Sequence, residues 1–169
     1  HIVYSVFKEV DFATSLLDGP HRKSNFAEAF REVRDAQSAD ATRLVDFAEY
    51  VPSYSPSASF IAAPVMDEGE VVGVLVFQMP IGEINKILTG GQNWKANGLG
   101  KTGEAFLVGG DGRMRSDARL LAEDKEAYLD VLRKQGHSEQ SLRKIEAQGT
   151  SILHQEARTA ATEKALAGK

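Results

Sequence analysis

The chain contains no cysteine among its 169 residues. It therefore has no disulfide, no thiolate nucleophile and no sulfur ligand for a cysteine-based zinc site. This absence suits the cytoplasm and equally the bacterial periplasm, where unpaired thiols are exposed to oxidation. The sequence also lacks an apolar run of the roughly 20 residues that a membrane-spanning helix needs. The longest apolar run, residues 71–77, has the length of a strand and is interrupted by Gly73.

An excess of one charge is also missing. Lysine and arginine number 20 and aspartate and glutamate 24, so the net charge is −4 at pH 7, and the cationic residues are scattered along the chain. Nucleic-acid-binding domains usually present a basic face, so we expect no nucleic-acid partner. The hydrophobic fraction of 42% and the charged fraction of 26% are those of an ordinary globular protein.

Catalytic and metal-binding motifs are not recognisable. There is no Gly-x-Ser-x-Gly elbow, and His137 and His154 are too far apart for a helical metal-binding pair. Asp111 and Gly112 suit a hairpin turn better than a calcium loop, because this dipeptide favours positive φ angles. We therefore expect a protein that is not an enzyme and that has no cofactor or metal. The rival class, a small enzyme or enzyme-regulatory subunit, requires a cluster of acid, base or nucleophilic groups.

Hydrophobic periodicity predicts a helix and several strands in the first half. Asn25 is expected to cap the helix, with Glu28 three residues later as in a capping box, and the helix is expected to end near Gln37. Pro64 is expected at a sheet edge or a bulge. Runs rich in β-branched and aromatic residues predict strands at residues 2–7, 59–65 and 71–79, and a strand or irregular segment at 44–47. Because the first run starts so abruptly, we expect its hairpin partner to lie upstream.

A Gly- and Asn-rich stretch, residues 89–100, is predicted to link two lobes, residues 1–88 and 101–169. The first lobe is expected to end with an amphipathic helix at 81–88. In the second lobe we expect a hairpin with strands at 104–108 and 113–116. Three helical stretches are predicted after it, at 120–132, at 138–147 and at 150–166.

Several segments of the chain resemble double Cache sensor domains, which form the extracytoplasmic part of bacterial chemoreceptors, sensor histidine kinases and membrane-bound nucleotide cyclases. The similar segments are residues 2–12, 60–65, 73–81 and 101–117. The pattern Thr102-Gly-Glu…Asp111-Gly…Arg115-Ser-Asp is the most diagnostic, and it opens the membrane-proximal lobe of such domains. The resemblance implies an α+β fold with PAS-like lobes, each built on a central antiparallel sheet. Residues 1–88 then form the membrane-distal lobe without its first helix and strand, and residues 101–169 the first part of the proximal lobe.

The resemblance also implies a function in signal transduction, such as chemotaxis through a methyl-accepting chemotaxis protein. The chain is then the periplasmic part of a receptor anchored in the inner membrane, and a homodimer is compatible with it. A small metabolite binds the distal lobe, and the resulting conformational change is transmitted towards the membrane. The alternative is a protein-interaction or regulatory module without a small ligand of its own.

The expected ligand site lies where a loop precedes two strands of the first lobe. Ligand pockets are mostly apolar with a few convergent polar groups, and the residues that meet this description are Asp46, Tyr50, Tyr54, Phe60, Ala62, Phe77 and Met79. Tyrosine hydroxyls and a carboxylate suit an amine or a hydroxylated metabolite. The alternative is that the three apolar side chains at 60, 77 and 79 are plain core. Amino-acid-binding members carry a tryptophan beside the distal pocket, whereas Trp94 falls in the linker, so the ligand class (amine, amino acid or carboxylate) stays open.

Overall fold

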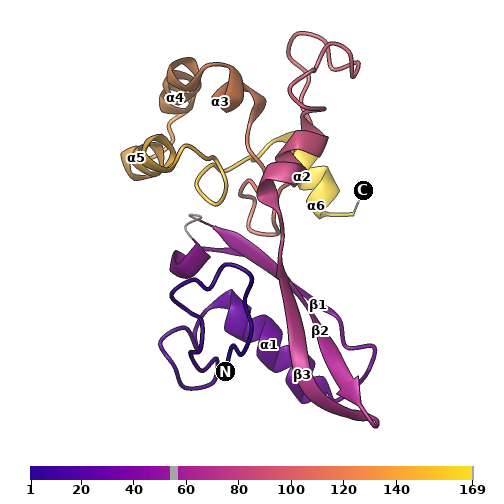
Figure 1. The fold of residues 1–169 in the computed structure, drawn as a ribbon. Coiled ribbons are helices and arrows are strands. Elements are labelled where there is room, and N and C mark those ends of the chain that lie inside the picture. The colour runs from indigo at the N-terminus through magenta and orange to yellow at the C-terminus, as the bar shows by residue number, and fades with distance from the viewer. Residues whose placement is uncertain (54–56, 169) are drawn as a thin grey trace. The chain divides into compact units, whose positions relative to one another are not determined.

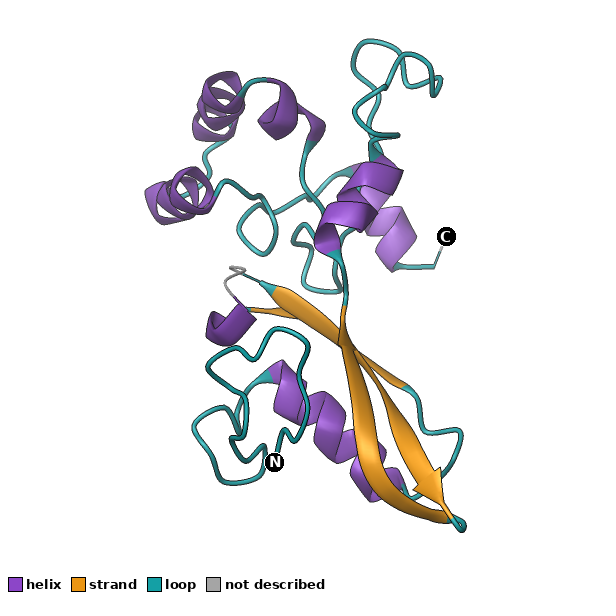
Figure 2. Cartoon of the chain, viewed as in Figure 1, coloured by secondary structure: helices purple, strands orange, loops and turns teal. Residues whose placement is uncertain are grey.

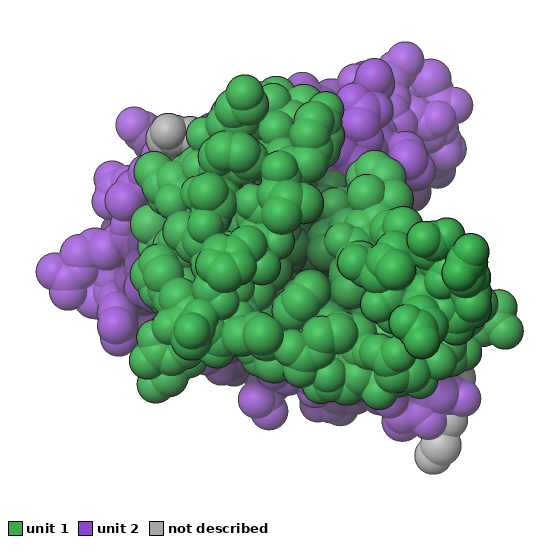
Figure 3. All heavy atoms as spheres, turned by 60° about the horizontal axis from the view of Figure 1, so that its bottom comes forward, with its two compact units in different colours: residues 1–79 green, residues 80–169 purple. Residues whose placement is uncertain are grey.

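The structure of the protein is a computed structural model that describes residues 1–53 and 57–168 (Figure 1). The described residues form six α-helices, one short 3-10 helix (Val51–Ser53) and one three-stranded antiparallel sheet (Figure 2). The predicted α+β fold class is confirmed. The chain divides into two compact units, His1–Met79 and Pro80–Lys169, which are coloured separately in Figure 3. We call them unit 1 and unit 2.

Helix α1 (Asn25–Ala36) packs against the sheet of unit 1. Its N-cap is Ser24, whose hydroxyl accepts the N–H of Ala27 at 3.2 Å. The prediction that Asn25 caps the helix was wrong by one residue, because the side chain of Asn25 turns inward and is buried. The helix ends where the sequence predicts, since Gln37 takes the left-handed conformation (φ 47°) of a C-terminal cap.

The sheet of unit 1 has the order β1-β2-β3, and each strand runs antiparallel to its neighbour. Its strands are β1 (Arg43–Ala48), β2 (Ala58–Asp67) and β3 (Glu70–Gln78). All three were predicted within one or two residues, and the turn between β2 and β3 uses Glu68 and Gly69 at positive φ.

Pro64 lies in the central strand β2, where a proline would ordinarily interrupt the ladder. Pairing with β1 extends along β2 only as far as Ala62, which lies opposite Arg43. Pro64 therefore has no β1 residue beside it and behaves as an edge residue. Pro64 itself pairs in regular register with Val74, and a register shift follows one residue later, between Val65 and Met66. Of the two predicted alternatives, the edge position describes Pro64.

The two faces of this sheet differ in burial, because successive side chains of a strand point to opposite faces. The face towards α1 carries the core of unit 1. The buried residues of this core are Ala29, Val33, Val45, Tyr50, Ala58, Phe60 and Ala62. On the opposite face Leu44, Leu75 and Phe77 are 63%, 50% and 60% exposed. We call this second surface the outer face.

Residues 2–7 do not form the predicted strand. Ile2 exchanges backbone hydrogen bonds with Thr14 and Ala13, which closes a loop, and the side chains of Val3 and Phe7 are exposed. Within the described residues no segment lies alongside to pair with residues 2–7. A strand without a neighbour leaves its backbone groups to water, so the local β propensity is not sufficient.

Unit 2 contains the other five helices of the described residues, and three of them pack around one apolar core. The helices are α2 (Ile81–Leu88), α3 (Arg119–Glu123), α4 (Lys125–Lys134), α5 (Glu139–Gln148) and α6 (Ala160–Leu166). Helices α3, α4 and α5 pack around the core, whose large buried side chains are Met114, Leu121, Tyr128, Leu129, Leu132, Leu142 and Ile145. Ser138 caps α5 and Gly149 ends it with φ 68°, both as predicted.

The predicted hairpin of unit 2 has its turn but not its strands. The N–H of Gly112 donates to the carbonyl of Gly109 at 2.9 Å, and a single bridge joins Val108 to Met114. Two further backbone hydrogen bonds join the arms of the hairpin, from the N–H of Gly109 to the carbonyl of Arg113 at 2.9 Å and from the N–H of Arg115 to the carbonyl of Leu107 at 2.7 Å. The N–H of Met114 points to the other side, where it donates to the carbonyl of Gln155 in a distant segment.

That distant segment was predicted as helix, and this was wrong for its first part. Of residues 150–166, only Ala160–Leu166 are helical. In the first part, the N–H of Ala157 donates to the carbonyl of Gly112, and the N–H of Leu153 donates to that of Met114. These long-range bonds replace the local ones of a helix.

The division between the units falls at Met79 and Pro80 and not in residues 89–100. Helix α2, which the sequence assigned to the first lobe, belongs to unit 2. Its Asn85 donates through Nδ2 to the carboxylate of Asp117 at 2.7 Å and accepts the N–H of the same residue. This side-chain bond across 32 residues was not visible in the local composition.

Residues 89–100 contain no helix or strand, yet one of their side chains is built into unit 2. Trp94 is 8% exposed, and the guanidinium of Arg119 lies over its ring at 4.6 Å. The same guanidinium donates to the carbonyl of Gly100 at 3.3 Å. A cation–π contact and a hydrogen bond therefore hold this Gly-rich stretch in place.

Candidate functional site

Three of the predicted ligand residues come together in the core of unit 1. Tyr50, Phe60 and Ala62 are 3%, 3% and 1% exposed. The ring of Phe60 stacks on Phe26 at 4.9 Å between centroids and meets Tyr50 edge-on at 5.0 Å. Because these rings contact one another directly, Phe60 packs as a core residue in this structure, which is the alternative given for it above.

Phe77 lies on the other side of the sheet from these residues. In the β2–β3 register Phe77 is opposite Ile61, whereas Phe60 is opposite Gln78. Neighbouring positions on one strand face opposite ways, so Phe60 and Phe77 cannot line the same surface of the sheet. Met79 follows β3, is half-buried, and donates its N–H to the carbonyl of Ser59, the residue before Phe60.

Of the two remaining predicted residues, the structure describes only Asp46. Asp46 is exposed in β1, where its carboxylate accepts the N–H of Phe47 at 2.7 Å and its carbonyl accepts Asn25 Nδ2. The hydroxyl of Tyr50 donates to a different carboxylate. Tyr54 lies outside the described residues.

The structure adds a carboxylate that the sequence did not single out. Asp11 is 5% exposed, and the hydroxyl of Tyr50 donates to its Oδ2 at 2.5 Å. Asp11 stands between the predicted strand at residues 2–7 and the first predicted helix. Its apolar neighbours Val10 and Phe12 are 67% and 36% exposed, so no local signal in the sequence indicates that Asp11 is buried.

Asn25 is the second residue that the sequence missed. Its Nδ2 donates to the carbonyls of Asp46 and Ala58, at 2.9 Å and 2.7 Å. Within the described part of the chain, its Oδ1 is buried and has no hydrogen-bond donor. A buried acceptor without a donor costs about 1–3 kcal/mol, and a donor supplied by a bound molecule would remove this cost. We call Asp11, Asn25 and Tyr50 of unit 1 the buried polar cluster; Tyr50 is hydrogen-bonded to Asp11, and Asn25 to the carbonyls of Asp46 in β1 and Ala58 in β2.

The electrostatics around the buried polar cluster favour the neutral forms of Tyr50 and Glu9. Burial raises the pKa of the Tyr50 phenol above its usual value, and the hydrogen bond to Asp11 and the charges of Asp11 and Glu9 raise it further. Burial also raises the pKa of Glu9, with a second contribution from Asp11. The charge of Asp11 contributes to both shifts and none of these three groups is a cation, so a positive charge placed beside Asp11 would be stabilised.

Alkaline pH provides a test of the packing around Tyr50. Burial likewise raises the pKa of Tyr128 in unit 2. Both phenols thus stay neutral in the folded chain, while unfolded tyrosines ionise above about pH 10. Stability contributed by these two groups is fully present below pH 10 and is lost above it, at up to about 1.4 kcal/mol per pH unit for each.

We expect Tyr50→Phe to make the alkaline fall of the free energy of unfolding shallower, as measured by denaturant titrations between pH 9 and pH 12. Tyr4→Phe is the matched control, because Tyr4 is 79% exposed and should leave the slope unchanged. An unchanged slope in Tyr50→Phe would contradict the burial of a neutral Tyr50.

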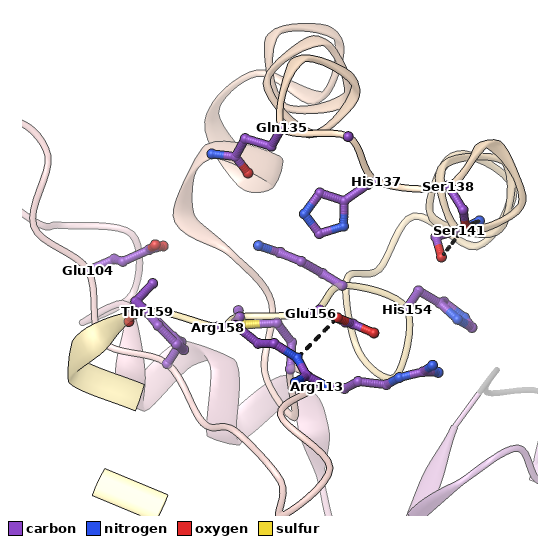
Figure 4. Close-up of a pocket in the computed structure, with 15 residues that line it drawn as sticks. Glu104, Arg113, Gln135, His137, Ser138, Ser141, His154, Glu156, Arg158 and Thr159 are labelled. Atoms are coloured by element: carbon purple, nitrogen blue, oxygen red, sulfur yellow. Dashed lines mark hydrogen bonds and ion pairs between the residues drawn. The ribbon is translucent and has the colours of Figure 1, made fainter. Parts of the chain in front are cut away.

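Unit 2 contains a hollow of about 670 Å³, which Figure 4 shows. We call it the unit 2 hollow. Its floor includes Phe106, Met114 and Ala157. The polar side chains around it include Glu104, Arg113, His137, Ser138, Glu156 and Arg158. This size lies within the roughly 300–1,000 Å³ of ligand pockets in general.

The charged groups of the unit 2 hollow are engaged to different degrees. Arg158 Nε lies 3.2 Å from a carboxylate oxygen of Glu156. Glu104 accepts the N–H of Arg119 through Oε2 at 2.8 Å. The guanidinium of Arg113 donates to an uncharged partner, the carbonyl of Leu153, at 3.1 Å.

The sequence pattern at residues 102–117 acts as a framework for unit 2. Arg115 is 7% exposed, and its guanidinium lies 3.0 Å from a carboxylate oxygen of Asp111. Ser116 accepts the N–H of Leu107 at 2.9 Å, and Asp117 accepts several hydrogen bonds from residues 85 and 150–151. These motif residues fix the loop that lines one side of the unit 2 hollow.

Residues 1–53 and 57–168 contain neither a metal-binding cluster nor a membrane-spanning helix. No three histidine, aspartate or glutamate side chains among them are arranged to hold a metal ion. None of the helices described is both long and apolar enough to cross a membrane. Comparisons with protein families, with curated proteins and with solved structures give no significant match to this chain.

Proposed function

We propose that this chain is the extracytoplasmic ligand-sensing module of a bacterial transmembrane signalling receptor, with the ligand bound in unit 1. The sequence resemblance to double Cache sensor domains supports this proposal, and the α+β fold agrees with it. The observation that carries it is the buried polar cluster. The carboxylate of Asp11 lies in the same small lobe as Asn25 Oδ1, an amide oxygen that has no donor within the described residues, and as the aromatic rings of the core.

The chemistry of this cluster favours a protonated amine as the ligand. Asp11 and Asn25 Oδ1 are acceptors, and an ammonium group carries up to three donors for them. The rings of Phe26, Tyr50 and Phe60 lie within 6 Å of one another, and aromatic faces attract cations. A carboxylate ligand would meet acceptors and negative charge here, which disfavours it.

Signalling requires that the ligand bind one arrangement of the chain more tightly than another. A ligand that reaches Asp11 has to exchange with the hydroxyl of Tyr50, whose bond to Asp11 spans 39 residues. Opening that bond loosens the loop at residues 8–20 from the core. The chain leaves unit 1 through β3 and enters α2 directly at Pro80, so this strand-to-helix junction is the covalent path by which the change is passed on.

A thermal-shift screen of the full chain against amines, amino acids and carboxylates tests the proposal. We expect amines to raise the melting temperature, since a ligand at 100 times its dissociation constant adds about 2.7 kcal/mol to stability. Asp11→Asn should abolish the shift, because the carboxylate is replaced by a neutral group of the same shape. Asp18→Asn is the control, since Asp18 is exposed. An undiminished shift in Asp11→Asn, or stabilisation by carboxylates alone, would contradict this site.

A second candidate function is a protein-interaction or regulatory module without a small ligand. The outer face of the sheet favours it, because Leu44 and Phe77 both lie opposite Ile61 and form an apolar row across the three strands. Large exposed apolar patches mark interaction sites. If no compound in the thermal-shift screen stabilises a well-folded chain, this second function replaces the first.

A further inference from the structure

We propose that the unit 2 hollow is a separate binding site for a small organic carboxylate with an apolar body. The proposal does not rest on the function proposed for unit 1. Every residue that lines the hollow belongs to unit 2, between residues 104 and 159. Its chemistry is also the reverse of that of the buried polar cluster, which offers acceptors.

The cationic wall of the hollow centres on Arg113. In Figure 4 the side chain of Arg113 runs beneath Glu156 towards His154. Its guanidinium donates to a neutral partner, the carbonyl of Leu153, at 3.1 Å. His137 projects into the hollow from the turn between α4 and α5. A planar guanidinium binds a carboxylate through two parallel hydrogen bonds, which makes Arg113 the expected anchor.

Two acidic residues line the hollow. Glu156 forms an ion pair with Arg158 at 3.2 Å, so these two charges balance each other. The charge of Glu104 is not balanced in this way, because its partner is the backbone N–H of Arg119, and Figure 4 shows it well apart from Arg113. A carboxylate ligand is therefore attracted to Arg113, because Arg158 already has a carboxylate partner in Glu156.

The apolar part of the ligand is inferred from the floor of the hollow. Met114 is 1% exposed and Ala157 7% exposed, and half-buried Phe106 packs against the same core. Ser138 caps α5 by accepting the N–H of Ser141 at 3.2 Å and adds a hydroxyl at the rim. The three apolar side chains lie among a larger number of polar ones, which suits a ligand with a charged head group and a small apolar body.

Benzoate and benzamide are matched probes for this site, because they share the ring and differ in the charge of the head group. In a titration followed by ¹⁵N NMR of the full chain, we expect benzoate to shift the backbone amides of Arg113, His137 and their neighbours. We expect the affinity for benzamide to be lower than that for benzoate by about tenfold or more. Equal affinities for the two probes, or shifts confined to other parts of the chain, would overturn the proposal.

Arg113→Gln should weaken benzoate binding by about tenfold or more. Arg143→Gln is the matched control, since Arg143 is an exposed arginine of α5 that does not line the hollow. Equal losses in the two variants would show a general charge effect and reject the site. If Arg113→Gln fails to fold, the comparison of the two probes on the unchanged chain still decides. The response of unit 1 to amines should be the same in both variants, which separates this proposal from the first.

Discussion

Replacing Asp117 with alanine is expected to lower the free energy of unfolding of unit 2 by about 3–5 kcal/mol. One carboxylate oxygen accepts the hydroxyl of Thr150 at 2.6 Å and the N–H of Ser151 at 2.9 Å. The other accepts Asn85 Nδ2 at 2.7 Å. Hydrogen bonds to a charged group contribute about 1.5–3 kcal/mol each, and the donors left behind are buried or partly buried.

The effect follows from where these donors come from. Asn85 belongs to α2, while residues 150–151 lead into the segment that runs beside Met114. Asp117 thus joins three parts of unit 2 that have no regular ladder between them. Few backbone bonds remain to hold these parts together once the carboxylate is removed.

Hydrogen exchange of the backbone amides of α4 and α5 measures this loss within unit 2. Asp130→Ala is the control, because Asp130 is an exposed acid paired with Arg133 at 2.7 Å, and such surface pairs contribute about 0–1 kcal/mol. Asp117→Asn keeps one acceptor oxygen and should fall between the two. If these amides are as well protected from exchange in Asp117→Ala as in Asp130→Ala, then Asp117 does not join these segments.

The helix ends were predictable because their signals are local. A helix cap needs one side chain and the first or last turn, so Ser138 and Gly149 could be identified from their neighbours alone. The same holds for Gln37 at the end of α1. The one-residue error at Asn25 arose because its amide bonds carbonyls 21 and 33 residues away, which outweighs its preference for a capping position.

Elements that depend on distant partners were predicted poorly. Residues 2–7 have the composition of a strand, but a strand forms only beside another, and the described chain offers none there. Residues 150–159 have helical periodicity, yet their backbone bonds go to residues 112–117. In both cases the local pattern was correct as a propensity and was overridden by pairing that sequence spacing does not reveal.

The candidate ligand site was predictable in part for the same reason. Its aromatic residues were identified, because Tyr50 and Phe60 flank an obvious loop. The carboxylate that the sequence predicted for this site is Asp46, whereas the acid that accepts the hydroxyl of Tyr50 is Asp11, on a loop before α1. No local feature indicates which of several acids a chain will bury beside a given hydroxyl.

Phe60 and Phe77 were predicted as members of one site, and substituting each with alanine should separate them. Phe60→Ala is expected to lower the free energy of unfolding of unit 1 by about 3–5 kcal/mol, because a 3% exposed ring is removed from a packed core. Phe77→Ala removes a 60% exposed ring and should change it by about 0.5 kcal/mol or less.

Hydrogen exchange of the β2 and β3 amides reports both variants on the same strands. The two substitutions delete the same atoms from adjacent strands, so composition and unfolded-state effects nearly cancel in the comparison. If the two losses were equal, the outer face would be covered in solution, by another copy or by another part of the chain. The ratio of the two losses therefore measures how open the outer face is, and with it the basis of the second candidate function.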